Sequence, residues 1–266
     1  MIVEIEDDGD TTVMHSEESD DLAGELLRDL RQYRLRRKKQ PNKISVIVPD
    51  RSGFGLEDIA CPKPNLDLAL HYNNDLQNTD DLILKSLKTK QSGLYLLHGL
   101  PGTGKSTYLR RIVNKTRRVV MFLSPRMAAN LDSPQLLGLL IRYSQSVLII
   151  EDAEELLSSR EQGANSAIST LLNLTDGILG ESLGIQIFCT FNTHVSRIDE
   201  ALLRKGRLIA AYEFGALEPA RAQALMESLG KANPLPAKAM TLAEIFNHET
   251  PAYELNPARR AIGFGR

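Results

Sequence analysis

The residues with the clearest capacity for chemistry lie in 99-GLPGTGKS-106, which has the spacing G-x-x-x-x-G-K-[ST]. Three glycines let backbone N–H groups approach an anion, the Lys105 ammonium adds positive charge, and the Ser106 hydroxyl can ligate Mg²⁺. The motif follows an apolar run and opens a helical one, as a phosphate-binding loop requires. We predict a nucleoside triphosphate site made of Gly99, Pro101, Gly102, Thr103, Gly104, Lys105, Ser106 and Thr107, with Thr107 facing the base or the α-phosphate.

Two acidic residues, Glu151 and Asp152, follow the buried-strand pattern 147-VLII-150. Carboxylates at such a strand end hold Mg²⁺ and orient the attacking water in nucleotide hydrolases. By position, Glu151 is the metal ligand and Asp152 is the water-side residue. Asp is one methylene shorter than Glu, so Asp152 needs a closer backbone or a bridging water. Alternatively, the pair merely begins an acidic helix face, 151-EDAEE-155.

These residues need a sheet to position them, and the pattern predicts one. Apolar runs at 94–98, 119–123, 147–150, 185–191 and 208–214 alternate with helical patterns at 106–115, 134–143, 166–177 and 199–205. Such alternation predicts an α/β fold with five parallel strands flanked by helices, as in P-loop NTPases. We place this core at residues 76–215, with a short helix at 80–88. Two amphipathic helices, near 218–230 and 240–247, predict a small helical lid within 216–266.

The first 75 residues form a separate N-terminal segment in this interpretation. A helix is expected from Ser19 to Pro41, a strand at 44–48, and an irregular connector at 49–75, which is rich in Pro and Gly. Basic residues cluster between Arg31 and Lys43. They are compatible with nucleic-acid or membrane-surface contact, and equally with a solvated helix C-terminus.

Composition excludes several classes of protein. The 266 residues are 42% hydrophobic and 25% charged, with a net charge of −2, which is an ordinary globular balance. No apolar run approaches the ~20 residues that span a bilayer. The acidic N-terminus does not have the pattern of a signal or transit peptide. Cys61 and Cys189 fit neither a metal spacing nor a disulfide framework. A cytoplasmic protein is expected.

Beyond these motifs, residues 80–215 resemble the ATPase core of the AAA+ family. The Glu151-Asp152 order is similar to that of the Bcs-type ATPases of mitochondria, as are 158-SSR-160, 171-LLNLTDG-177 and 191-FNTHVSRIDEALLRKGRL-208. Small bacterial and phage AAA proteins share this arrangement. The resemblance implies ATP and Mg²⁺ as cofactors and ATP hydrolysis as the activity. It also implies a homo-oligomeric ring, a hexamer or a heptamer.

The resemblance also assigns roles to residues near the fourth core strand. The family's strand order, 5-1-4-3-2, places Asn192 between the phosphate loop and the carboxylates, where an amide can hold water and sense the γ-phosphate. Arg204 and Arg207 match paired arginine fingers that reach the neighbouring subunit's nucleotide. The alternatives are an Asn that caps a strand and two surface arginines.

Further arginines have weaker assignments under the same resemblance. Arg160 lies either at a subunit boundary or on an ordinary surface. Arg259 and Arg260 follow the predicted lid helices, where an arginine can contact nucleotide.

The loop after the second core strand bears on what such a ring acts on. It reads 124-SPRMAANLDSP-134, without an aromatic residue or a glycine, and its bulky apolar residues are Met127 and Leu131. This composition argues against threading of an unfolded chain. We therefore predict an AAA+ ring that remodels or disassembles a protein partner. Two alternatives stay open: a DNA-directed AAA+ ATPase, acting as a loader or a replication or transposition helper through 31–43, and a slow nucleotide-dependent switch.

Overall fold

The structure is a computed structural model. It describes residues 2–5, 11–32, 43–50, 53–128, 131–154, 166–192, 202, 206–231 and 236–247. These residues fall into two compact units, Met1–Gln40 and Pro41–Arg266. Each unit is described by itself.

The N-terminal unit is a hairpin followed by a helix. Strands β1 (Ile2–Ile5) and β2 (Thr11–Met14) pair antiparallel, and a short 3-10 turn leads into α1 (Asp20–Gln32). The hairpin was not expected from the sequence. The predicted helix is confirmed from Asp20 to Gln32, and its expected end at Pro41 lies outside the described residues.

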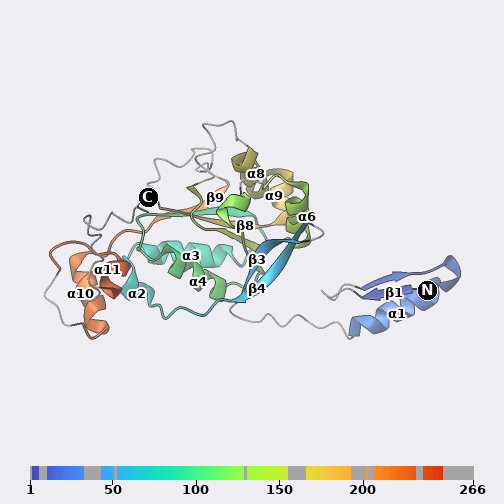
Figure 1. The fold of residues 1–266 in the computed structure, drawn as a ribbon, viewed down its shortest axis with the longest axis horizontal. Helices are drawn as coiled ribbons and strands as arrows, with labels where there is room; N and C mark the ends of the chain where they lie inside the picture. The colour runs from blue at the N-terminus through green and yellow to red at the C-terminus, as the bar shows by residue number, and fades with distance from the viewer. Residues whose placement is uncertain are drawn as a thin grey trace, which may run out of the picture. The chain divides into compact units, whose positions relative to one another are not determined.

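The core unit is built on a seven-stranded sheet with the order β4-β3-β6-β7-β8-β5-β9 (Figure 1). The strands are β3 (Lys43–Asp50), β4 (Gly53–Ala60), β5 (Gly93–His98), β6 (Val120–Phe122), β7 (Val147–Ile150), β8 (Gln186–Phe191) and β9 (Leu208–Glu213). The five predicted strands are confirmed, and their order, β9-β5-β8-β7-β6, is 5-1-4-3-2. The expectation of a five-stranded sheet was wrong, because β3 adds in parallel beside β6 and β4 adds antiparallel beside β3.

The hairpin β3–β4 corrects the interpretation of residues 49–75 as an irregular connector. Its register pairs Lys43 with Ala60 and Asp50 with Gly53 over eight residue pairs. The Lys43 ammonium forms an ion pair with Asp58, and the Ser45 hydroxyl donates to the same carboxylate. Residues 43–60 therefore belong with the core sheet rather than with the N-terminal segment.

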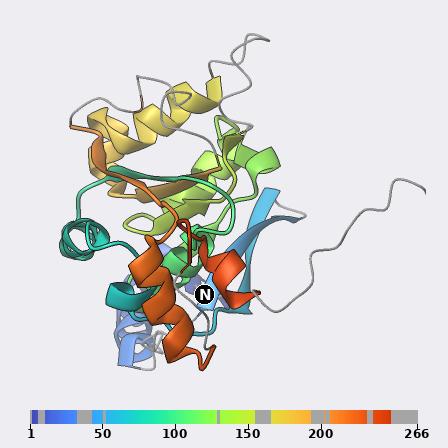
Figure 2. The same ribbon diagram turned by 90° about the vertical axis from the view of Figure 1, so that its left-hand side faces the viewer.

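Helices cover both faces of the sheet (Figures 1 and 2). On one face, α6 (Pro134–Arg142), α8 (Ser166–Thr175) and α9 (Gly177–Leu183) pack on Leu94, Leu96, Leu148 and Ile150. On the other face, α3 (Leu76–Ser86) and α4 (Lys105–Lys115) pack on Tyr95, Leu97 and Ile149. Side chains alternate between the faces because successive residues of a strand point to opposite sides. The helix expected at 166–177 is confirmed as α8, whereas α9, which begins at Gly177, was not expected.

The remaining helices are short. They are α2 (Leu68–His71), α5 (Pro125–Ala128), α10 (Pro219–Ser228) and α11 (Leu242–Phe246). The last two lie where the sequence predicted the two helices of the lid, and Leu225 and Ile245 bury their apolar sides in the core. Within the described part of the chain, no helix is long and apolar enough to cross a membrane.

A buried ion pair fixes α3 against α4, the helix that carries the phosphate loop. Asp80, 1% exposed, accepts from the Tyr108 hydroxyl at 3.0 Å and from Arg111 Nη2 at 2.6 Å. We expect Asp80→Ala to lower the free energy of unfolding by about 3–5 kcal/mol, because the change leaves a largely buried Arg111 charge without its partner. Urea denaturation measures this loss. A loss as small as that of Asp81→Ala, a change on the exposed side of the same helix, would contradict the prediction.

Candidate nucleotide-binding site

The phosphate loop connects β5 to α4 and is held in shape by its own side chains. Gly99 has φ of +131°, and a Cβ there would lie 2.3 Å from the Phe214 carbonyl oxygen, so no larger residue fits. The Lys105 Nζ donates to the carbonyls of Gly99 at 2.8 Å and Leu100 at 2.9 Å. The buried Thr103 hydroxyl donates to Leu100 as well, at 2.7 Å. These bonds give the loop a defined form.

The electrostatics of the loop link it to the carboxylates of β7. Burial lowers the pKa of the Lys105 ammonium, and the charges of Asp152, Glu154 and Glu151 oppose that shift. These carboxylates therefore lie close enough to Lys105 for their charges to act on its protonation. This is the pairing of charges that a site for a Mg²⁺–nucleotide complex needs, since the lysine faces the phosphates and the carboxylates face the cation.

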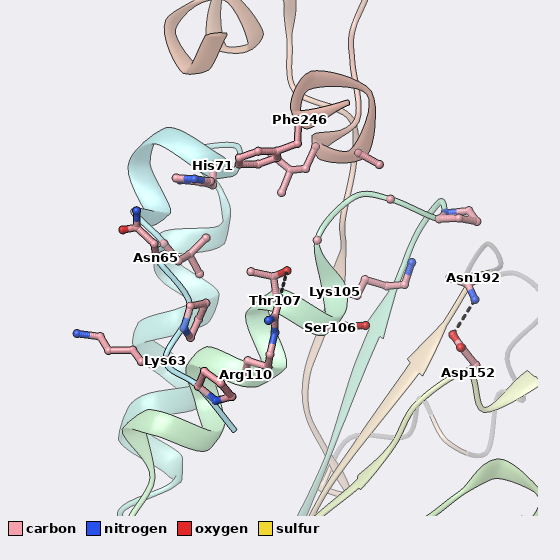
Figure 3. A pocket seen from close by; sticks show the side chains of 18 residues that line it. Lys63, Asn65, His71, Lys105, Ser106, Thr107, Arg110, Asp152, Asn192 and Phe246 are labelled. Atoms are coloured by element: carbon pink, nitrogen blue, oxygen red, sulfur yellow. Dashed lines mark hydrogen bonds between the residues drawn. The ribbon is translucent and has the colours of Figure 1, made fainter. Parts of the chain in front are cut away.

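A cavity of about 800 Å³ opens at the loop (Figure 3). Eight of the predicted site residues line it: Pro101, Gly102, Gly104, Lys105, Ser106, Thr107, Asp152 and Asn192. Gly99, Thr103 and Glu151 do not line it. Gly99 and Thr103 belong to the loop itself, where both are buried and help to shape it. The structure thus brings the phosphate loop, Asp152 and Asn192 to one space.

The backbone at Asp152 explains the reversed order of the carboxylates. Asp152 has φ of +50°, in the left-handed region, which Asp and Asn adopt more readily than Glu does. Its N–H donates to the Thr190 hydroxyl at 2.9 Å, and the next N–H, of Ala153, donates to the Thr190 carbonyl at 2.8 Å. The turn after β7 is thereby fastened to β8. A short side chain at this position suits the turn.

Asn192 lies directly after β8, between the strand of the phosphate loop and the strand of the carboxylates, as expected. Its Nδ2 donates to Asp152 Oδ1 at 2.7 Å, and its backbone N–H donates to the Glu154 carboxylate. Two residues 40 positions apart thus form one polar pair at the wall of the cavity. The amide fixes the direction in which the Asp152 carboxylate points.

Glu151 has the character of a metal ligand. Its Oε1 atom is buried and has no hydrogen-bond partner among the described residues. A buried carboxylate oxygen needs a cation or a donor. The described residues hold no cluster of three or more His, Cys, Asp or Glu side chains suited to a metal. Mg²⁺ takes one or two protein ligands and completes its shell with waters and phosphate oxygens. Glu151 and the exposed Ser106 hydroxyl fit that role.

The opposite wall of the cavity was missed from the sequence. It is made by residues 62–66 and His71 from the segment read as a connector, and by Leu242, Ala243 and Phe246 of the lid. The His71 and Phe246 rings are stacked, with centroids 6.0 Å apart and planes 20° apart (Figure 3). Pro62 and Pro64 marked an irregular backbone. No periodicity indicated that this backbone lies beside the phosphate loop.

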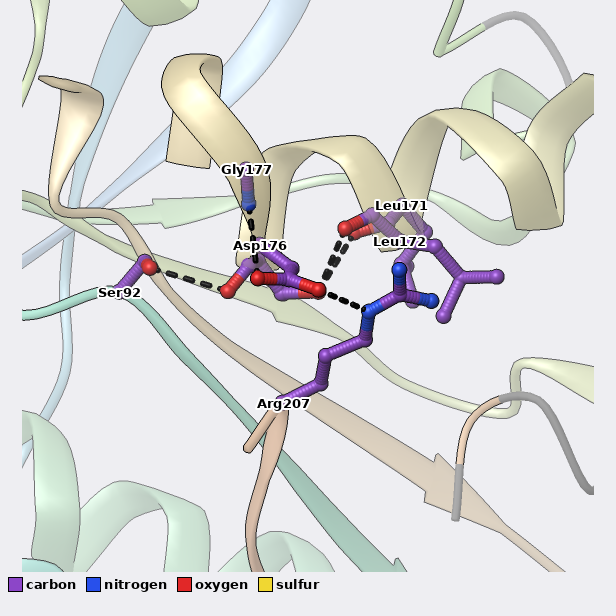
Figure 4. A network of polar contacts seen from close by, with 7 residues as sticks. Ser92, Leu171, Leu172, Asp176, Gly177 and Arg207 are labelled. Atoms are coloured by element: carbon purple, nitrogen blue, oxygen red, sulfur yellow. Dashed lines mark hydrogen bonds and ion pairs between the residues drawn. The ribbon is translucent and has the colours of Figure 1, made fainter. Parts of the chain in front are cut away.

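Arg207 lies at the other end of the sheet from the phosphate loop. It precedes β9, whose first residue pairs with the start of β5, whereas the loop follows the end of β5. At about 3.3 Å per residue, the two sites are separated by roughly 16 Å along the strand. Arg207 Nε donates to Asp176 Oδ2 at 2.6 Å, and this bond lowers the pKa of Asp176 (Figure 4). Asp176 Oδ1 accepts from the Gly177 N–H at the start of α9.

The other residues that the sequence singled out either fall outside the described residues or pack with the core. Arg204, Arg160, Arg259 and Arg260 fall in segments that are not described. Leu131 is fully buried, and Met127 packs against the same core cluster. These two apolar side chains of the loop after β6 therefore face the protein's own interior rather than a substrate.

Gly104 offers a test of how closely the lid contacts the phosphate loop. It has φ of +97°, and a Cβ there would lie 2.6 Å from Leu242 Cδ1 and 3.0 Å from the Tyr72 ring. We expect Gly104→Ala to weaken ATP binding about tenfold or more, since strain of this kind costs about 1–3 kcal/mol. Calorimetric titration with ATP measures the affinity. Gly138→Ala is the matched control, because nothing lies within 4 Å of its added methyl group. Equal affinities in the two variants would refute the prediction.

Comparison with known proteins agrees with this geometry. Residues 95–216 match the family described as "ATPase family associated with various cellular activities (AAA)". The chain is 33% identical over 125 residues to the bovine protein named "Mitochondrial chaperone BCS1", and 32% identical to its human counterpart. These alignments cover 43% of this chain and 29% of each relative.

An Arabidopsis thaliana protein named "AAA-ATPase ASD, mitochondrial" is 30% identical over 180 residues, covering 53% of this chain and 34% of the relative. The chain thus spans about a third of the length of these relatives or less. The family match at residues 95–216 includes the phosphate loop, the carboxylate turn and Asn192. Residues 95–216 therefore resemble the AAA ATPase family, and the chain is similar over this part of its length to relatives of the Bcs1 type.

Proposed function

We propose that this protein is a Mg²⁺-dependent ATPase that acts as a ring and uses its ATP cycle to remodel a protein partner. The observation that carries the proposal is the cavity itself. Lys105 and Ser106 lie on one side of it, and the hydrogen-bonded pair Asp152–Asn192 lies on the other. This arrangement supports phosphate binding and water activation in one space.

The placement of the residues at the cavity supports a separate role for each of them in ATP hydrolysis. Lys105 exchanges its two loop carbonyls for phosphate oxygens when ATP binds. Asn192 orients Asp152, whose carboxylate accepts a proton from the attacking water, directly or through a second water. Glu151 and Ser106 would hold Mg²⁺, which would supply positive charge to offset that of the phosphates. The reversed carboxylate pair is in this proposal a working site, with each residue suited to its backbone.

The ring is supported by the distance of Arg207 from the protein's own phosphate loop. A guanidinium at the far end of the sheet serves no nucleotide in the same subunit, but it can serve one bound to a neighbour. The site is then incomplete in a single subunit. Turnover therefore requires assembly, and the AAA family typically forms rings of this kind.

A protein partner is supported by two observations. A relative that shares this domain is named a chaperone. In addition, Leu131 after β6 is buried in the core and Met127 packs against it, which argues against a threading loop at this position. A folded cargo moved by changes in ring shape fits both observations.

The test is ATP turnover as a function of protein concentration, with light scattering to follow assembly and calorimetry to follow ATP binding. Specific activity is expected to rise with concentration and to depend on Mg²⁺. Arg142→Ala, at the exposed end of α6, is the matched control for the variant Arg207→Ala and should turn over ATP as the wild type does. ATP binding without turnover at any protein concentration would refute the ATPase proposal and favour a nucleotide-dependent switch.

A further inference from the structure

Arg221, on the first lid helix, binds a segment far from it in sequence. Its Nη1 donates to the carbonyls of Ala69 at 2.8 Å and Tyr72 at 2.6 Å, and its Nη2 donates to the Asn74 side chain. Three acceptors thus meet one planar guanidinium, a geometry that Lys cannot reproduce. The contacts hold the end of α2 against α10.

The segment that Arg221 holds reaches the nucleotide cavity at two points. His71 lines the cavity. The Tyr72 hydroxyl donates to the Gly104 carbonyl of the phosphate loop at 2.9 Å. Tyr72 is 3% exposed, and its ring meets those of Tyr108 and Phe214 edge-on. The hydroxyl therefore has little freedom to follow the loop unless its own backbone moves.

A second set of contacts joins the lid to the same loop. The Ala243 N–H of α11 donates to the Gly102 carbonyl at 3.0 Å. The Asn73 side chain donates to the Ala216 carbonyl, just before α10, at 3.1 Å. The lid is thus tied to the phosphate loop directly through Ala243, and indirectly through Arg221 and Tyr72.

We infer that Arg221 is a positioning residue for ATP binding, which acts through Tyr72 on the backbone of the phosphate loop. Arg221 is not among the residues that line the cavity. It fixes the backbone from which the Tyr72 hydroxyl reaches Gly104, so the position of the lid sets the shape of the loop. This inference rests on the proposed function, because it concerns the same ATP site.

The experiment is a double-mutant cycle on ATP affinity with Arg221→Ala and Tyr72→Phe, measured by calorimetry. Each single change is expected to weaken ATP binding by about five- to tenfold, the size of one charged or one buried hydrogen bond. Both changes break the same connection. The double variant should therefore lose no more ATP affinity than the more strongly affected single variant loses. Arg221→Lys keeps the positive charge but not the planar guanidinium. Its ATP affinity should therefore lie between those of Arg221→Ala and the wild type. KM should rise with kcat held near its wild-type value.

The control is Gln223→Ala on the same helix, whose side chain pairs only locally with Glu227 in the described contacts. Additive losses in the double variant, or wild-type affinity in Arg221→Lys, would overturn the inference. If Arg221→Ala does not fold, Tyr72→Phe and Arg221→Lys complete the same cycle. Failure of the wild-type protein to bind ATP would instead overturn the proposed function, and this inference with it.

Discussion

Arg207→Ala is expected to reduce ATP turnover about a thousandfold while the protein still assembles and binds ATP. A guanidinium directed at the γ-phosphate stabilises charge that develops only in the transition state, and its loss costs about 10³-fold or more in rate. Arg207 lies about 16 Å along the sheet from its own phosphate loop, so in the proposed ring the lost charge would be the one offered to a neighbouring subunit. Steady-state turnover, with scattering on the same samples, measures both properties.

Mixing two inactive variants makes this test specific. Lys105→Met removes the phosphate-binding charge but keeps Arg207, and Arg207→Ala does the reverse. In mixed rings, some interfaces combine an intact Lys105 with an intact neighbouring Arg207, so activity should return on mixing. Asp176→Asn is the control for the intramolecular ion pair, because the amide oxygen still caps α9 while the carboxylate charge is lost. It should keep most of the activity. Mixtures that stay inactive would exclude a shared site.

Asp152→Asn is expected to lower kcat about a hundredfold or more with ATP affinity unchanged. The substitution removes the group that accepts the water's proton, and such a group contributes about 10²–10⁴-fold. The backbone is undisturbed, since Asn also tolerates the left-handed φ of +50°. The amide oxygen can still accept the bond from Asn192. Single-turnover kinetics separate this chemical step from binding.

The order of the carboxylates can be tested at the same position. Asp152→Glu places a residue with a poorer fit to the left-handed turn and a longer side chain against Asn192. We expect turnover to fall about tenfold, since backbone strain of this type costs about 1–3 kcal/mol. Glu151→Gln should instead raise the Mg²⁺ concentration needed for half-maximal rate. Wild-type turnover in Asp152→Glu would show that the left-handed turn does not select the short side chain.

Much of the sheet is predictable because buried parallel strands leave a plain signal. The runs at 94–98, 147–150 and 185–191 are short, apolar and bounded by polar or glycine residues, and each forms a strand within one residue of its expected bounds. The phosphate loop is equally local, since its glycines and lysine act through the backbone around them. Short-range chemistry therefore suffices for this half of the site.

What could not be predicted depends on contacts between distant residues. β4 reads 53-GFGLEDIA-60, with two glycines and two acids, and forms a strand because β3 pairs with it along its whole length. The 62–66 wall has no pattern of its own. Asp176 and Arg207 are 31 residues apart, and each looks like a helix end or a surface charge until the sheet is folded. The left-handed φ of Asp152 is equally invisible in the sequence.

The order of the central strands also sets when the active site can exist during synthesis. β5, which carries the phosphate loop, borders neither β6 nor β7, although both follow it in the chain. The two halves of the site meet only when β8 inserts between β7 and β5, after residue 191 is available. A nascent chain that ends before residue 191 leaves the edges of β5 and β7 that face β8 unpaired, and it has no complete site. A complete site therefore reports that β8 has joined β5 to the strands β6 and β7.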